Sequence, residues 1–116
     1  MINDDRLNDL GSTIMKLVRD RLIDKFDGIC SGSLRSQRAI ELQKLLSSFD
    51  EQQKEIIKTL VIECVDNTIF NFLFMFEEDQ DKELFVSGIN ANDISDGLSG
   101  ELFTEDGWIA KFSKNP

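Results

Sequence analysis

The chain has 116 residues, with 22 Asp and Glu against 13 Lys and Arg, and its formal net charge is −9. This length fits one domain, residues 1–116. The acidic balance argues against binding to nucleic acid or to an anionic membrane, because both need clusters of Lys and Arg. The absence of His also excludes catalytic triads and metal sites that use imidazole.

The N-terminal part of the chain predicts two helices joined by a loop. The first covers 4–27 and ends at Asp27-Gly28, because Gly tolerates the positive φ found just past a helix end. After a loop over 28–33, Ser33 or Ser36 can cap the second helix. The apolar residues with helical spacing are Leu7, Leu10, Ile14, Leu17, Leu22 and Phe26 in the first helix and Ile40, Leu42, Leu45, Leu46 and Phe49 in the second.

A third and longer helix is predicted to start after Asp50, which forms an acidic variant of the capping box with Gln53. Apolar residues keep helical spacing from Ile56 to Phe76 without a Gly or Pro, so this is the expected central helix. Because its polar stripe is narrow, we expect it to be nearly surrounded by protein. The alternation of Phe with other residues over 69–76 also fits a strand, which stays open as an alternative.

The last third of the chain predicts shorter elements. Residues 77–83 form a charged turn, and Leu84–Val86 and Leu102–Phe103 are either brief strands or apolar anchors. Thr104 is the expected N-cap of a final helix, and residues 113–116 are expected to fray. The predicted fold is therefore mainly α, with a three-helix core, a long central helix, an irregular acidic segment that can hold a short β-hairpin, and a short C-terminal helix; α+β is the alternative.

The sequence predicts no catalytic, cofactor or metal site. The loop after Cys30 lacks the Cys-x5-Arg spacing of a phosphate-binding nucleophile, since Ser36 stands where the Arg is needed. The acidic tail gives no EF-hand register, and an irregular divalent-cation site at Asp93, Asp96 and Glu101 is the remaining alternative. We therefore expect that the protein is not an enzyme.

The cysteines and apolar stretches bear on the cellular location. Without an apparent export signal, Cys30 and Cys64 are expected to be free thiols in the cytoplasm. The longest strongly apolar stretch, Thr68–Phe76, is far shorter than the ~20 residues that span a bilayer. We therefore expect no membrane partner.

The charge is unevenly distributed along the chain. Residues 1–76 hold 12 acidic and 10 basic side chains, whereas residues 77–106 hold 10 acidic and one basic. Apolar residues interrupt the acidic segment, which indicates that it folds onto the helices with its acids outward. The predicted partner-binding residues are Glu77, Glu78, Asp79, Asp81, Asp93, Asp96, Glu101, Glu105 and Asp106.

Two stretches, 66–72 (DNTIFNF) and 96–112 (DGLSGELFTEDGWIAKF), resemble small acidic bacterial proteins of the toxin-immunity type. The resemblance implies a binding protein and assigns no site residue. The leading hypothesis is thus an immunity-type inhibitor whose acidic surface binds a basic toxin. The alternative is a small helical regulatory or scaffold subunit that forms homo- or hetero-oligomers, such as a homodimer, through the Phe70 and Phe74 side of the central helix.

Overall fold

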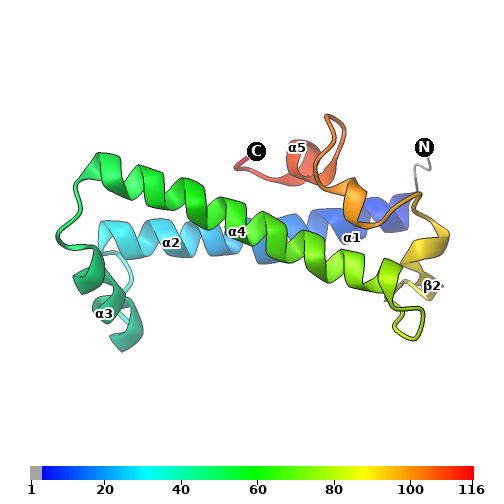
Figure 1. Ribbon diagram of the computed structural model, residues 1–116, viewed down its shortest axis with the longest axis horizontal. Helices are drawn as coiled ribbons and strands as arrows, with labels where there is room; N and C mark the ends of the chain where they lie inside the picture. Colours follow the sequence, from blue (N-terminus) through cyan, green and yellow to red (C-terminus); the bar gives the residue numbers. More distant parts are fainter. Residues whose placement is uncertain (1–3) are drawn as a thin grey trace.

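The computed structural model describes residues 4–116, and the molecule is elongated, with extents of 48 × 28 × 22 Å. Helix α1 (Asp5–Ile14), a π-helical turn (Met15–Asp20) and helix α2 (Arg21–Ser31) form one continuous rod. Helix α4 (Glu51–Glu78) runs back along this rod in the opposite direction (Figure 1). The resulting helix pair is the frame on which every other element packs.

The first rod is longer than predicted. Gly28 lies inside α2, buried against Leu34, and the helix instead ends at Gly32, whose φ of 76° is in the left-handed region. The expected helix end at Asp27-Gly28 is therefore wrong. Position 28 requires Gly because Leu34 packs closely against it, and the helix does not end there. The reversal itself falls four residues later, where Gly is again favoured by the positive φ.

Helix α3 (Gln37–Leu46) closes one end of the helix pair. Of the two predicted caps, Ser36 is the one used, and its Oγ accepts a hydrogen bond from the Ala39 amide at 3.1 Å. The capping box at the start of α4 is confirmed, since the Gln53 amide donates to Asp50 and the Asp50 amide donates to the Gln53 side chain. Lys58 on α4 reaches Asp27 on α2 at 2.9 Å, and this hydrogen-bonded contact raises the pKa of Lys58.

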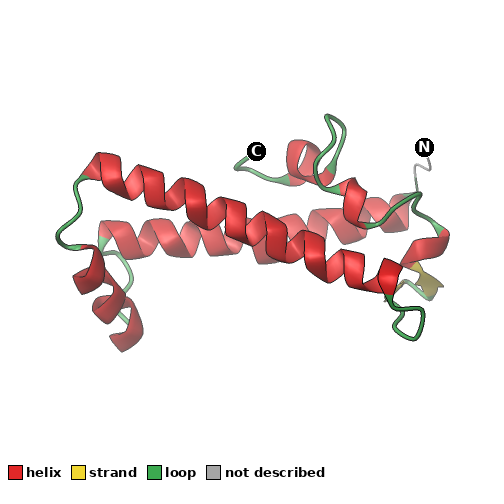
Figure 2. Ribbon diagram, viewed as in Figure 1, coloured by secondary structure: helices red, strands yellow, loops and turns green. Residues whose placement is uncertain are grey.

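Helix α4 continues unbroken to Glu78, so the alternative strand over 69–76 is not formed (Figure 2). The expectation that this helix is nearly surrounded by protein is wrong within the chain. Its 28 residues include four buried ones, which are Val65, Asp66, Ile69 and Leu73. A helix this apolar is left largely exposed because residues after 78 cover one part of its length.

The remaining chain forms a small hairpin and short helical turns. Strands β1 (Phe85–Val86) and β2 (Ile89–Asn90) pair antiparallel, with Val86 opposite Ile89. Two 3-10 turns (Ala91–Asp93 and Ser99–Glu101) lead to helix α5 (Trp108–Phe112). The mainly α fold with a small hairpin is thus confirmed, whereas the predicted Thr104 cap is wrong, because Thr104 sits in a turn and Gly107 precedes α5.

The hydrophobic core lies where this C-terminal segment packs against α1, the π-helical turn and the second half of α4. Trp108 is 1% exposed, and its indole ring lies so close to Gly11 that a Cβ atom at position 11 would overlap it. The core residues are Leu7, Met15, Val65, Ile69, Leu73, Ala91, Ile94, Leu98, Leu102 and Trp108. The acidic segment is therefore folded onto the helices through its apolar residues, as predicted.

Candidate functional site

A polar hollow of about 370 Å³ lies at the end of α4, between that helix and residues 80–97. Three predicted partner-binding residues, Glu77, Asp93 and Asp96, line it together with Glu83, and Lys82 is the basic residue among those that line it. These carboxylates make the hollow strongly negative. A cationic side chain of a partner is the group that such a hollow can accept.

Local hydrogen bonds hold the hollow in shape. The Asn92 amide nitrogen donates to the Phe76 carbonyl at 2.8 Å and so fixes the first 3-10 turn against the end of α4. The Asn90 side chain caps the same turn by accepting from the Asn92 backbone at 3.0 Å. Glu77 accepts from the Ser99 amide, which ties α4 to the second turn. The hollow is consequently built by the fold rather than by mobile side chains.

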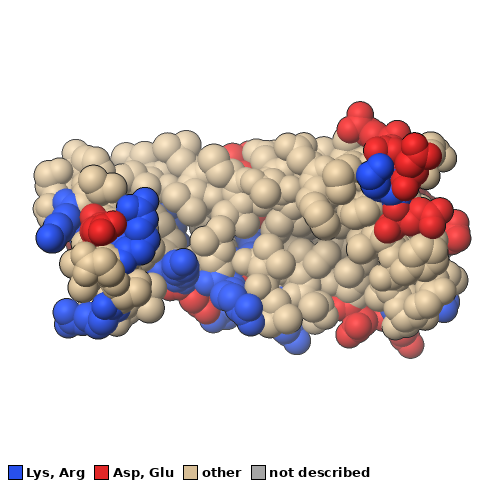
Figure 3. Space-filling view, turned by 90° about the horizontal axis from the view of Figure 1, so that it is seen from below, with Lys and Arg blue, Asp and Glu red and all other residues tan. Residues whose placement is uncertain are grey.

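The structure places the other predicted residues at different distances from this hollow. Glu78, Asp79 and Asp81 lie exposed where α4 ends and the next turn begins, and together with the hollow they form the acidic end of the molecule (Figure 3). The loop that carries Glu105 and Asp106 lies on the opposite side of the helix pair from the 79–83 turn (Figure 1). The predicted acidic surface is therefore divided between two sides of the molecule.

The alternative cation site is not assembled. Within residues 4–116, no group of three or more Cys, Asp and Glu side chains is placed to hold a metal ion. Glu101 is half-buried and accepts a hydrogen bond from Ser95 Oγ at 2.6 Å, so it is engaged by its own loop.

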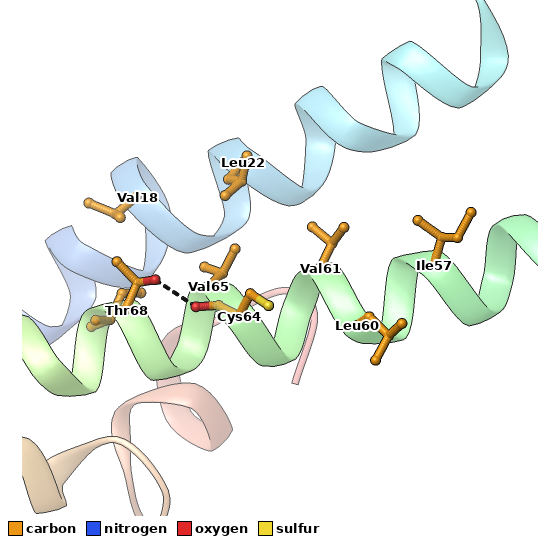
Figure 4. A pocket seen from close by; sticks show the side chains of 9 residues that line it. Val18, Leu22, Ile57, Leu60, Val61, Cys64, Val65 and Thr68 are labelled. Atoms are coloured by element: carbon orange, nitrogen blue, oxygen red, sulfur yellow. Dashed lines mark hydrogen bonds between the residues drawn. The ribbon is translucent and has the colours of Figure 1, made fainter. Parts of the chain in front are cut away.

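A second candidate surface, which the sequence reasoning missed, is an apolar groove between the rod and α4. Its volume is about 370 Å³, and a smaller hollow of about 280 Å³ continues it past Ile14 and Phe72. In Figure 4, Val18 and Leu22 face α4 across the groove, while Leu60 lies on the outer side of α4. The lining residues are Val18, Leu22, Ile57, Leu60, Val61, Cys64, Val65, Thr68 and Ile69.

Large side chains at this groove are widely exposed. The exposed fraction is 61% for Leu60, 58% for Ile56, 53% for Phe72 and 49% for Val18. We call the groove, together with Phe72 and the neighbouring Ile56, the apolar face. The sequence could have indicated this face, because α4 has apolar residues around most of its circumference and a chain of this length has too few other segments to bury them all.

The apolar face differs from the side predicted for oligomerisation. Phe70 is half-buried, and its ring stacks on Phe74 at 5.8 Å and lies 5.9 Å from the ring of Phe103. A loop of the chain itself thus occupies much of the Phe70 side.

By length and composition α4 is also apolar enough to cross a membrane, a property that core helices of soluble proteins share.

A buried charged cluster joins the rod, α4 and the C-terminus. Arg19 is 3% exposed and makes a two-pronged contact with Asp66, at 2.7 Å from Nε and 3.3 Å from Nη2. Its remaining nitrogen donates to Ser113 Oγ at 2.8 Å and to the Asn115 carbonyl. The guanidinium therefore reaches all three segments at once.

Asp20, the next residue of the π-helical turn, holds the same C-terminal segment. It accepts hydrogen bonds from Ser113 Oγ at 2.6 Å, the Lys114 amide at 3.0 Å and the Asn115 side chain at 3.0 Å. Burial by itself would raise the pKa of Asp20, but these hydrogen bonds and the charge of Arg19 outweigh it and lower the pKa. The expected fraying of residues 113–116 is thus wrong for 113–115.

The two cysteines are free thiols in the structure. Cys64 is exposed and lines the apolar groove, whereas Cys30 is half-buried in α2. Burial raises the pKa of Cys30, with the nearby charges of Asp27 and Glu51 acting in the same direction and that of Lys54 opposing it. A raised pKa favours the protonated thiol over the more nucleophilic thiolate.

Comparison with known proteins finds no match for this chain among protein-family models, curated proteins or solved structures.

Proposed function

We propose that the protein binds another protein, as an immunity-type inhibitor whose acidic end covers a basic site on its partner, such as a bacterial toxin. The observation that supports this most directly is the polar hollow, where Glu77, Glu83, Asp93 and Asp96 surround one space. A Lys or Arg side chain of the partner would enter the hollow, and the protein would act by covering the site rather than by chemistry.

Electrostatics would set the speed and the selectivity of this binding. The exposed carboxylates beside the hollow, Glu78, Asp79 and Asp81, extend the negative potential outward. Such a field raises the association rate with a basic partner and disfavours acidic ones. The association rate should therefore be high at low salt and should fall steeply as the salt concentration rises.

The test compares two variants with equal changes in net charge. The first reverses the acidic end with Glu78→Lys, Asp81→Lys, Asp93→Lys and Asp96→Lys. The control reverses four exposed carboxylates elsewhere with Glu41→Lys, Glu55→Lys, Glu105→Lys and Asp106→Lys.

The partner retained by the wild-type protein from its host lysate serves as the probe, and the association rate is measured at several salt concentrations. We expect the first variant to lose binding and the control to keep it. Equal effects of both variants would show that net charge acts without this surface, and retained binding by the first would contradict the proposal.

A second candidate function, that of a small scaffold subunit acting through oligomerisation, is favoured by a different observation. The apolar face leaves Leu60, Ile56 and Phe72 more than half exposed in the isolated chain. Exposed apolar patches of this kind are typical of protein–protein interfaces. This function uses the middle of the molecule and leaves the acidic end free.

A further inference from the structure

We infer that two copies of this chain associate antiparallel through their apolar faces, related by a two-fold axis that passes near Cys64. The inference rests on the second candidate function, oligomerisation, and is independent of the acidic end. It names the partner as a second copy and fixes the direction in which the two copies meet.

The chain exposes more surface area than a compact monomer of its mass. The molecule exposes 7475 Å² for a mass of 13.2 kDa. A compact monomer of this mass exposes about 6,400 Å², so the excess is on the order of 1,000 Å². The radius of gyration of 16.7 Å likewise exceeds the ~13 Å expected for a compact chain of this length.

The apolar face is large enough to account for a stable interface. From Ile56 to Phe72, α4 extends about 24 Å at 1.5 Å per residue, and two neighbouring helices are ~20 Å wide. The face therefore measures about 500 Å² in projection, and its relief increases the area further. This approaches the ~800 Å² that each partner buries in a standard interface.

The charge distribution selects a second copy in antiparallel orientation. Residues 21–58, which form the α2–α3 end, hold seven basic and six acidic side chains, against one basic and ten acidic in 77–106. Figure 3 shows Asp and Glu gathered at one end of the molecule, and Lys and Arg at the other end and along the lower edge toward the middle, with mainly uncharged surface above them. A parallel pair would place two strongly acidic ends together, whereas an antiparallel pair separates them and brings each to an end whose charges nearly balance.

The position of the two-fold axis follows from the groove. On α4, the two joined hollows are lined from Ile57 to Phe72, and Cys64 stands midway between these residues and is exposed. An isologous antiparallel contact centred on the groove therefore brings the two copies of Cys64 near each other. Ile57 of one copy then lies close to Phe72 of the other, and the two helix pairs form a four-helix bundle.

Light scattering coupled to size exclusion tests the association. The wild-type protein should have twice its chain mass of 13.2 kDa and keep it in high salt, since apolar contact dominates the interface. Leu60→Glu should yield a monomer with unchanged helical circular dichroism, because Leu60 is 61% exposed and its replacement leaves the fold of the single chain intact. Leu45→Glu is the matched control, since Leu45 is 68% exposed on α3 outside the groove, and it should stay dimeric.

Cross-linking tests the direction and the axis. With Cys30→Ser, a short bismaleimide should join two chains through Cys64, whereas Cys64→Ser should remain uncrosslinked. In a background without native cysteines, Ile57→Cys mixed with Phe72→Cys should give the mixed cross-linked dimer, and Ile57→Cys alone should give none.

Each other outcome overturns a defined part of the inference. Self-association is ruled out if the wild-type protein stays monomeric at all concentrations. It is also ruled out if the monomer instead binds neutral lipid vesicles or a different protein through this face. These outcomes leave the acidic-end proposal untouched. A dimer that survives Leu60→Glu keeps the oligomerisation function but rejects this face. A cross-link of Ile57→Cys to itself shows a parallel pair.

Discussion

The two halves of α4 have similar apolar sequences but very different surroundings. In the second half, Leu73 is fully buried and packs in a core with Met15 and Trp108, which are 0% and 1% exposed. In the first half, Ile56 and Leu60 are 58% and 61% exposed, although they follow the same helical spacing. The segment after residue 84 covers one side of the second half, where Phe72 on another side stays 53% exposed, and it leaves the first half bare.

This comparison teaches that an apolar helix is buried only where the chain provides a cover. The covered half resembles the interior of an ordinary small domain, with a buried Trp and a hydrogen-bonded ion pair. The bare half resembles one side of an interface whose second side is supplied from outside. The predictions below separate these two situations by the energetic response of each half, measured in dilute protein where the chain is monomeric.

The largest difference is expected between Trp108→Ala and Leu60→Ala. The Trp108 change leaves a cavity in the covered half and should lower the free energy of unfolding by about 3–5 kcal/mol. Leu60 is 61% exposed in the bare half, so its truncation should cost less than about 0.5 kcal/mol. Urea unfolding followed by circular dichroism measures both, and similar losses would contradict the division into two halves.

The buried ion pair should give the next effect. Asp66→Asn leaves Arg19, which is 3% exposed, as an uncompensated buried charge and should cost about 3 kcal/mol. The double variant Arg19→Met with Asp66→Leu removes both charges and should recover much of this loss. A double variant as unstable as the sum of its single changes would show that the two residues act independently.

Gly11→Ala should destabilise the protein, although the same change usually stabilises a helix by up to ~1 kcal/mol. A methyl group at position 11 overlaps the Trp108 ring, and overpacking costs about 1–3 kcal/mol. Gly100→Ala is the control, because its Cβ would meet open space. Thermal melting of both variants gives the sign, and a stabilised Gly11→Ala would mean that the ring moves freely.

In the bare half, local interactions should matter more than packing. Asp50→Ala removes the side-chain cap and half of the capping box at the start of α4, which should cost about 1 kcal/mol. Asp50→Ser keeps an acceptor at that position and should restore most of the stability. Loss of stability in both variants alike would point to the charge of Asp50 rather than to its cap.

The smallest effect is expected from pH, through Asp20. Because its pKa is lowered in the folded protein, its contacts stabilise fully above the unfolded-state value of about 4 and are lost as the pH falls through the folded-state value. The stability difference between wild type and Asp20→Asn should be constant near neutral pH and shrink in acid. A difference that grows in acid would show that Asp20 does not hold the C-terminus as a carboxylate.

Local sequence rules were sufficient for most of the secondary structure. The capping box at Asp50 and Gln53, the Ser36 cap and the helical spacing across 56–76 each depend on residues within about one turn of one another, so the sequence reports them directly. The acidic segment was likewise predictable as folded, since Ile94, Leu98 and Leu102 interrupt its charges.

The tertiary structure decided what each surface faces. Gly28 packs against Leu34 and Gly11 packs against Trp108, which are outside the helix that holds each glycine. The rule that Gly marks a helix end therefore gave the wrong end at Gly28. The order of residues does not reveal that Glu105 and Asp106 lie across the molecule from the hollow at Asp93 and Asp96. Nor does it reveal that the segment after residue 84 packs on only part of α4. Burial of a helix depends on which other segments pack against it, and the apolar pattern of the helix alone does not give this.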